Sequence, residues 1–138
     1  MSTIDSQLPY EIEIEVNESD IDQLGHVNNT VYLRWVQDAA TAHWSIIASE
    51  EEQKSLLWVV VKHEIEYKRP AFLHDRIVAQ TWLGGLTRRH FERFTEIKRF
   101  SDGKLLASAL TVWCPVDAKS KKPVRASEEI KAKFSSDQ

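Results

Sequence analysis

The side chains with the strongest chemical character stand together in residues 20–35, DIDQLGHVNNTVYLRW. Asp20, Asp22, Gly25 and His26 precede two asparagines, and a helical pattern of apolar residues follows directly. A helix N-terminus offers unpaired backbone N–H groups and the positive end of a dipole, which suit an anion such as the oxyanion of an attacked carbonyl. A nearby carboxylate can act as a nucleophile or as a base toward water. The segment therefore fits chemistry on a carbonyl group.

Simpler interpretations of the same segment compete with this one. Asp and Asn before a helix commonly do no more than cap its N–H groups. The run D-x-D-x-x-G imitates half of a calcium loop, but Leu24 and Val31 stand where an oxygen ligand and a glutamate are needed. The histidines, at positions 26, 43, 63, 74 and 90, show no zinc-ligand spacing among themselves or with Cys114. We therefore expect no metal and no cofactor.

The composition indicates an ordinary globular protein. The 138 residues fit one domain, which we place at 1–138, and a net charge of −3 argues against a nucleic-acid binder. No segment approaches the ~20 apolar residues of a membrane span, and the N-terminus has no signal-peptide pattern. The single cysteine can form no internal disulfide. We expect a cytoplasmic protein with neither a nucleic acid nor a membrane as partner.

The periodicity of apolar residues predicts one long helix and five strands. Residues 10–17 alternate as a half-buried strand does, and from Tyr32 the apolar spacing predicts a helix of about five turns that ends near Ala48–Glu52. Strand patterns then cover 56–68, 76–86, 90–100 and 105–116, and a short amphipathic helix covers 127–134. The pattern of 90–100 suggests a bulge or a strand covered on both faces. This order predicts an α+β fold, with successive late strands paired antiparallel and two open sheet edges, one of which a second copy could cover.

Two strings resemble motifs of a known family. DQLGHVNNTVYLRW (residues 22–35) resembles the D-x-x-G-H-V-N-N-x-x-Y-x-x-[WY] signature of the 4-hydroxybenzoyl-CoA thioesterase-like branch of the hot-dog superfamily. EIEYKRPAFLHDRI (residues 64–77) resembles that family's strand–Tyr-x-x-Pro-Ala-x-x-x-Asp turn, and the likeness extends from about Tyr10 to Phe134. The resemblance implies a hot-dog fold, a five-stranded antiparallel sheet wrapped around one long central helix. It also implies an acyl-CoA thioesterase that works as a homodimer or homotetramer, with its active site between two protomers.

The resemblance also implies roles for single residues. Asp22 takes the place of the family's catalytic aspartate, three residues before the glycine, whereas Asp20 is the weaker candidate. The backbone N–H of Asn29 would receive the oxyanion, and Gly25 would permit a tight turn or a close approach of the ligand. The other residues expected at the substrate are His26, Asn28 and Tyr32, although His26 can equally pack on a partner subunit.

Adjacent arginines, Arg88 and Arg89, stand at the entrance of a predicted strand. Such residues are commonly just solvated, but the phosphates of coenzyme A need cations. The resemblance implies that a basic segment between these two strands contacts the nucleotide. We therefore assign Arg88 and Arg89 to coenzyme A, with Lys68 and Arg69 as weaker candidates.

Two other functions remain compatible with these residues. A non-catalytic acyl-CoA or acyl-carrier-protein binder would hold the ligand without releasing a thiol. An acyl-carrier-protein thioesterase would prefer carrier-bound substrate. The sequence does not resemble a dehydratase with a catalytic histidine on the central helix, and we expect His43 in mid-helix to be a core residue.

Overall fold

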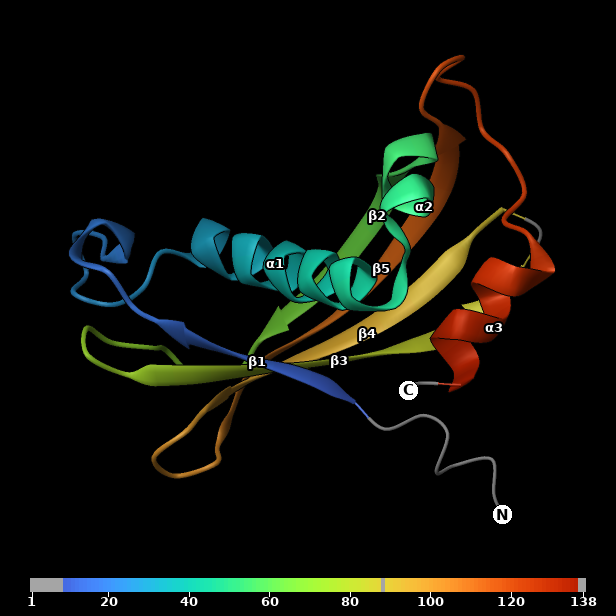
Figure 1. Cartoon of the computed structure of the whole chain (residues 1–138). Coiled ribbons are helices and arrows are strands. Elements are labelled where there is room, and N and C mark those ends of the chain that lie inside the picture. The colour runs from blue at the N-terminus through green and yellow to red at the C-terminus, as the bar shows by residue number, and fades with distance from the viewer. Residues whose placement is uncertain (1–8, 88, 137–138) are drawn as a thin grey trace.

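The computed structural model describes residues 9–87 and 89–136, and its five described strands form one antiparallel sheet. The strands are β1 (Tyr10–Glu15), β2 (Leu56–Tyr67), β3 (Arg76–Leu86), β4 (Phe91–Arg99) and β5 (Leu105–Asp117), in the spatial order β1-β3-β4-β5-β2. The helices are α1 (Asn29–Ile47), α2 (Glu50–Ser55) and α3 (Glu128–Ser136), and a 3₁₀ turn, η2, covers Glu18–Asp20. Figure 1 shows the sheet curving around α1. The predicted α+β architecture with one long helix is confirmed.

The path of β2 differs from the expectation that successive late strands pair. β3 pairs with β4 and β4 with β5, but β2 lies at an edge and pairs with β5. Residues 68–75, which link β2 to β3, must therefore cross the end of the sheet. They do so beside β5, where the N–H groups of Lys68 and Arg69 donate to the carbonyl of Leu106 (2.7 and 3.1 Å). This crossing places the Tyr-x-x-Pro-Ala segment at the same end of the sheet as the start of α1.

Two local features also differ from the prediction. The sequence analysis did not predict α2, because its six polar residues have no apolar period; its signal was the capping box, in which Ser49 accepts the N–H of Glu52 (3.1 Å). For β4, the second of the two predicted alternatives holds: its residues are buried on one face and half-buried on the other, so the strand is covered on both faces. The bulge of β2 lies between Val60 and Lys62. Because of this bulge, the residues that face α1 are even-numbered before Val61 and odd-numbered after Lys62. The alternation of apolar residues in the sequence does not reveal such a change.

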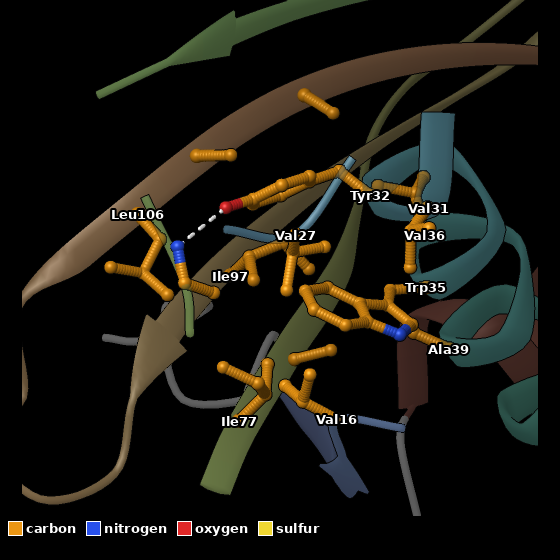
Figure 2. Packing of buried hydrophobic residues seen from close by; sticks show 14 residues of the cluster. Val16, Val27, Val31, Tyr32, Trp35, Val36, Ala39, Ile77, Ile97 and Leu106 are labelled. Carbon is orange, nitrogen blue, oxygen red and sulfur yellow. Dashed lines mark hydrogen bonds between the residues drawn. The ribbon is translucent and has the colours of Figure 1, made fainter. Parts of the chain in front are cut away.

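One apolar stripe fixes the rotation of α1 on the sheet. Val31, Tyr32, Trp35, Val36 and Ala39 are buried at helical spacing. Figure 2 shows them against sheet residues that include Ile77, Ile97 and Leu106. Full burial of one large apolar side chain contributes roughly 1.5–3 kcal/mol, so this stripe strongly favours a single placement of α1. The N-terminus of α1 is thereby held near residues 68–75.

The two open edges of the sheet differ in length and character. β1 has six residues, and its glutamates are exposed. β2 has twelve residues, and its exposed side chains include Leu57, Val59 and Val61. Because charged residues protect an edge and long apolar edges invite pairing, β2 is the edge better suited to a second copy. None of the described helices is long and apolar enough to cross a membrane.

Candidate active site

The segment between η2 and α1 is a narrow hairpin. An antiparallel bridge joins Ile21 to Val27, and the N–H of Asp22 donates to the carbonyl of His26 (2.9 Å). Gly25, next to His26, has a φ of +87°, a left-handed conformation that glycine adopts without the steric cost of a side chain. The hairpin therefore holds Asp22 beside His26, directly before α1.

The two aspartates of this segment have different surroundings. Asp20 is 2% exposed, and both of its carboxylate oxygens are occupied: Oδ1 accepts from Arg34 (3.0 Å) and Oδ2 accepts the N–H of Asn17 (2.9 Å). Asp22 is half-buried, and its Oδ1 accepts the N–H of Leu24 (2.9 Å). The Oδ2 atom of Asp22 receives no hydrogen bond from the described residues. Asp20 is thus committed to the fold, whereas Asp22 keeps one oxygen for other partners.

The first turn of α1 leaves one backbone donor open. Asn28 is the N-cap, and its Oδ1 accepts the N–H (2.9 Å) and the hydroxyl (2.7 Å) of Thr30. The N–H of Val31 donates to the carbonyl of Asn28 (2.9 Å). The N–H of Asn29 has no acceptor among the described residues. Capping therefore explains the side chain of Asn28 but leaves the peptide N–H of Asn29 available to a ligand.

A cavity of about 240 Å³ adjoins the start of α1. Its wall includes His26, Asn29, Tyr32, Tyr67, Lys68 and Arg69. The hydroxyl of Tyr67 donates to the carbonyl of Asn29 (3.1 Å), while the hydroxyl of Tyr32 accepts the N–H of Ala71 (2.9 Å; Figure 2). Burial raises the pKa of both phenols, so they stay neutral. Two cations and a helix N-terminus make this cavity suited to an anionic group.

The structure brings part of the predicted set together. His26, Asn29 and Tyr32 line the cavity, whereas Asp22, Gly25 and Asn28 lie in the adjacent hairpin and do not form its wall. Tyr32 is 2% exposed, so it belongs chiefly to the core. His26 makes a 3.3 Å contact from Nδ1 to the carbonyl of Val27. The described residues contain no group of three or more His, Cys, Asp or Glu that could hold a metal ion.

The predicted arginines lie elsewhere. Arg88 lies outside the described residues, and Arg89 is exposed in the turn between β3 and β4. The start of α1 contacts Ala71, before β3, whereas its C-terminal half contacts Arg93, just after that turn. The start of α1 and the turn between β3 and β4 are therefore at opposite ends of the sheet within one protomer (Figure 1), which separates Asn29 from Arg89. Lys68 and Arg69, the weaker candidates, are the cations beside Asn29.

Tyr67 was not singled out from the sequence, although it contacts Asn29. Its side chain lies at the end of β2, a strand that follows α1 and α2 in the chain, so no local spacing connects the two residues. The available signal was the tyrosine of EIEYKRPA, within the second motif. That motif crosses the sheet end beside α1, which explains why the two motifs meet.

The fold and the two motifs define a class of protein. A family model described as the thioesterase-like superfamily matches residues 16–134, so the chain belongs to that superfamily. The predicted family, the hot-dog fold and the class of enzyme, a thioester hydrolase, are thereby confirmed.

Particular relatives extend this result. The chain is 26% identical to the long-chain acyl-CoA thioesterase FadM of Escherichia coli (strain K12) over 127 residues, 88% of this chain and 94% of that protein. It is 35% identical to the putative acyl-CoA thioesterase YneP of Bacillus subtilis (strain 168) over 74 residues, 51% and 54% of the two chains. Among solved structures, a thioesterase from Thermus thermophilus, complexed with coenzyme A and Zn, superimposes with a TM-score of 0.81. That similarity covers 92% of this chain and 98% of the Thermus chain at 26% identity.

Proposed function

We propose that this chain hydrolyses acyl-CoA thioesters to a carboxylic acid and coenzyme A. One observation carries the proposal: a single hairpin holds a carboxylate with an open oxygen, Asp22, directly before the open N–H of Asn29. The relatives named acyl-CoA thioesterases support this substrate class. The coenzyme A complex of the Thermus thioesterase supports it further.

In the proposed reaction, Asp22 acts on the thioester carbonyl in one of two ways. It attacks the carbonyl carbon to form a mixed anhydride that water then opens, or it deprotonates a water molecule that attacks instead. Negative charge develops on the carbonyl oxygen in both routes, and the N–H of Asn29 with the dipole of α1 stabilises it. The C–S bond breaks, and coenzyme A leaves as a thiolate that takes up a proton. The proposal assigns no step to a metal or a cofactor, so a chelator should leave the rate unchanged.

We place the working site between two copies of the chain. Antiparallel pairing of two β2 edges would satisfy the open backbone groups of both. The end of one β2 strand, with Tyr67, then lies beside the beginning of the other. Because Arg89 is remote from Asn29 within one protomer, Arg89 would reach the nucleotide only from the partner. A homodimer is then the smallest active unit, and a homotetramer would be two such dimers.

The direct test is a thiol-release assay over a panel of acyl-CoA esters, with short, long and aromatic acyl groups. We expect release of coenzyme A that follows enzyme concentration and is unaffected by chelator. Ligand binding without thiol release would instead indicate an acyl-CoA-binding protein. A large preference for carrier-bound over coenzyme A esters would indicate an acyl-carrier-protein thioesterase.

The nucleotide contact is tested with a shortened substrate. The double variant Arg88→Ala/Arg89→Ala should raise KM for coenzyme A esters more than for N-acetylcysteamine thioesters, which lack the nucleotide. Lys119→Ala/Lys121→Ala, in the turn after β5, serves as the control for general loss of positive charge. An equal effect of the arginine variant on both substrate types would contradict the nucleotide role.

A further inference from the structure

A second cavity, of about 250 Å³, lies about three to four turns of α1 beyond Asn29. Its wall is largely apolar and includes five aromatic residues, Trp44, Trp58, Phe91, Trp113 and Phe134. These side chains come from α1, β2, β4, β5 and α3, so almost every layer of the fold contributes. Arg93 of β4 also lines this cavity, although it is only 3% exposed.

Arg93 is a buried cation without a counter-ion. Its Nη1 donates to the hydroxyl of Thr81 (3.0 Å) and lies 3.2 Å from Nδ1 of His43. No carboxylate of the described residues forms an ion pair with Arg93. Its Nε and Nη2 atoms donate no hydrogen bond to any described residue. The ring of Phe134 lies 5.6 Å from the guanidinium carbon. Burial of a charge is unfavourable unless a partner compensates it, so an anion beside the guanidinium would be stabilising.

The neighbours of Arg93 leave its positive charge in place. Burial lowers the pKa of Arg93 to about 10, so the guanidinium stays charged at neutral pH. Burial, helped by Arg93 itself, lowers the pKa of His43 to about 4, so that imidazole is neutral. The interior beside the cavity therefore carries one uncompensated positive charge.

Two more donors at the cavity lack acceptors. The indole N–H groups of Trp58 and Trp113 are buried and have no hydrogen-bond partner among the described residues. Both tryptophans line the cavity. Because buried donors in native proteins are rarely left unpaired, a guanidinium and two indoles around one space indicate a ligand with acceptor oxygens. The aromatic wall indicates that the remainder of that ligand is apolar.

We propose that this cavity binds the carboxylate of a small apolar carboxylic acid, with Arg93 as its cationic partner. The volume is below the roughly 300–1,000 Å³ of pockets for drug-sized ligands, so the acid is compact. Two sources carry this chemistry: a free acid, and an acyl group whose far end is a carboxylate. The second source would enter from the partner's thioester site. In an antiparallel pair of β2 strands, Trp58 at the beginning of one strand lies near Tyr67 at the end of the other.

The binding arm of the test does not depend on hydrolysis. Octanoate and 1-octanol are titrated into the full-length protein, with tryptophan fluorescence and calorimetry as readouts. We expect octanoate to bind at least about 10-fold more tightly than 1-octanol. Arg93→Met should weaken octanoate about 10- to 100-fold, the usual effect of a hydrogen bond to a charged group, and should affect 1-octanol less. Arg76→Met, an exposed arginine paired with Glu13, should leave octanoate binding unchanged. Equal affinity for the two ligands, or full octanoate affinity in Arg93→Met, would overturn the proposal.

A second variant keeps the test decisive if Arg93→Met does not fold. Ala40 lines the cavity from α1, so Ala40→Leu fills part of the space and leaves the guanidinium unchanged. Circular dichroism first establishes that this variant is folded. We expect its octanoate affinity to fall at least about 10-fold, and unchanged affinity would show that octanoate does not bind in this cavity.

The hydrolysis arm rests on the proposed function and distinguishes the two sources. If the ligand is an acyl group, kcat/KM for octanedioyl-CoA should exceed that for octanoyl-CoA, and Arg93→Met should lower this ratio about 10-fold or more. Octanoate binding combined with preference for octanoyl-CoA would identify a free acid as the ligand. Absence of all thioester hydrolysis would contradict the proposed function, while the octanoate titration would still decide the cavity's ligand.

Discussion

The two ends of α1 carry polar sites of opposite construction. At the N-terminal end, the Asp22 carboxylate lies in a short hairpin and the Asn29 N–H lies in the first turn of α1 directly after it, and both are partly open. Near the C-terminal end, Arg93 of β4 is buried and lines a cavity together with aromatic residues of four other elements. The first site depends on main-chain groups and a helix dipole, and the second depends on a buried side chain.

This contrast determines what each end can do without a ligand. Open groups such as the Asn29 N–H can be satisfied by water, so an empty N-terminal site carries little penalty. The Arg93 guanidinium is only 3% exposed and has no carboxylate partner among the described residues, so an anion in the adjoining cavity would stabilise it. Substitutions should therefore affect catalysis at the N-terminal end, and ligand affinity or pH-dependent stability near the C-terminal end.

The largest effect is expected at Asp22. Asp22→Asn should lower turnover about 10²- to 10⁴-fold, the usual scale for one acid–base group, because the amide can neither attack nor accept a proton. Its thermal midpoint should stay near wild type, since Asn can still accept the N–H of Leu24. Steady-state thiol release and thermal unfolding measure the two properties. Asp38→Asn, on the exposed face of α1, is the matched control, and wild-type turnover in Asp22→Asn would contradict the assignment.

The pH dependence of stability probes the other end of α1. In the unfolded chain His43 takes up a proton near its ordinary pKa of 6.5, but in the folded chain its pKa is only about 4. Between these values the unfolded state binds more protons, so stability should fall as pH is lowered, by up to about 3 kcal/mol. His43→Gln should remove this part of the slope, because the amide does not titrate and can still accept from Arg93.

Urea unfolding at a series of pH values between 7 and 4 checks this expectation. His90→Gln, an exposed histidine before β4, is the control and should keep the wild-type slope. Parallel curves for wild type and His43→Gln would contradict a half-buried neutral imidazole beside Arg93.

The same contrast explains which features could be predicted from the sequence. The long helix and all five strands were predicted within a few residues, because amphipathic periods are local. The placement of Asp22, Gly25 and Asn29 together at the start of α1 could be predicted because they lie within eight positions, whereas their chemical roles stay predictions. The position of β2 at an edge of the sheet was not predicted, since strand order depends on contacts between distant segments. Neither could local spacing reveal that Tyr67 reaches Asn29.

The burial of Arg93 could not be predicted from the sequence at all. In FERFTEIKR, apolar and charged residues occur at both parities, and nothing in the type of Arg93 indicates burial. Only the register of the sheet does so, because Arg93 shares the inward parity of Phe91, Thr95 and Ile97. Whether a polar residue on that face is solvated or enclosed depends on α1 and α3, which pack there from other parts of the chain.

The next largest effect is expected on stability, at Asp20, and it distinguishes the role of Asp20 from that of Asp22. Asp20→Asn should lower the free energy of unfolding by about 2 kcal/mol, because a buried carboxylate loses charge-assisted bonds to Arg34 and Asn17. Arg34→Met should cost less, since that side chain is half exposed and its ion pair is screened. Urea midpoints measure both. If Asp20→Asn were stable but inactive, Asp20 rather than Asp22 would be the reacting carboxylate.

The smallest effect compares two glycines that differ in distance from the site. Gly25 and Gly103 both have positive φ, and an added methyl group would meet no atom within 4 Å at either position. Ala at each should therefore cost about 1 kcal/mol of stability through backbone strain alone. Only Gly25→Ala should also lower kcat, because strain at Gly25 shifts the hairpin that orients Asp22 toward Asn29. Equal kcat values in the two variants would show that the hairpin tolerates such a shift, and the role of Gly25 would then be limited to stability.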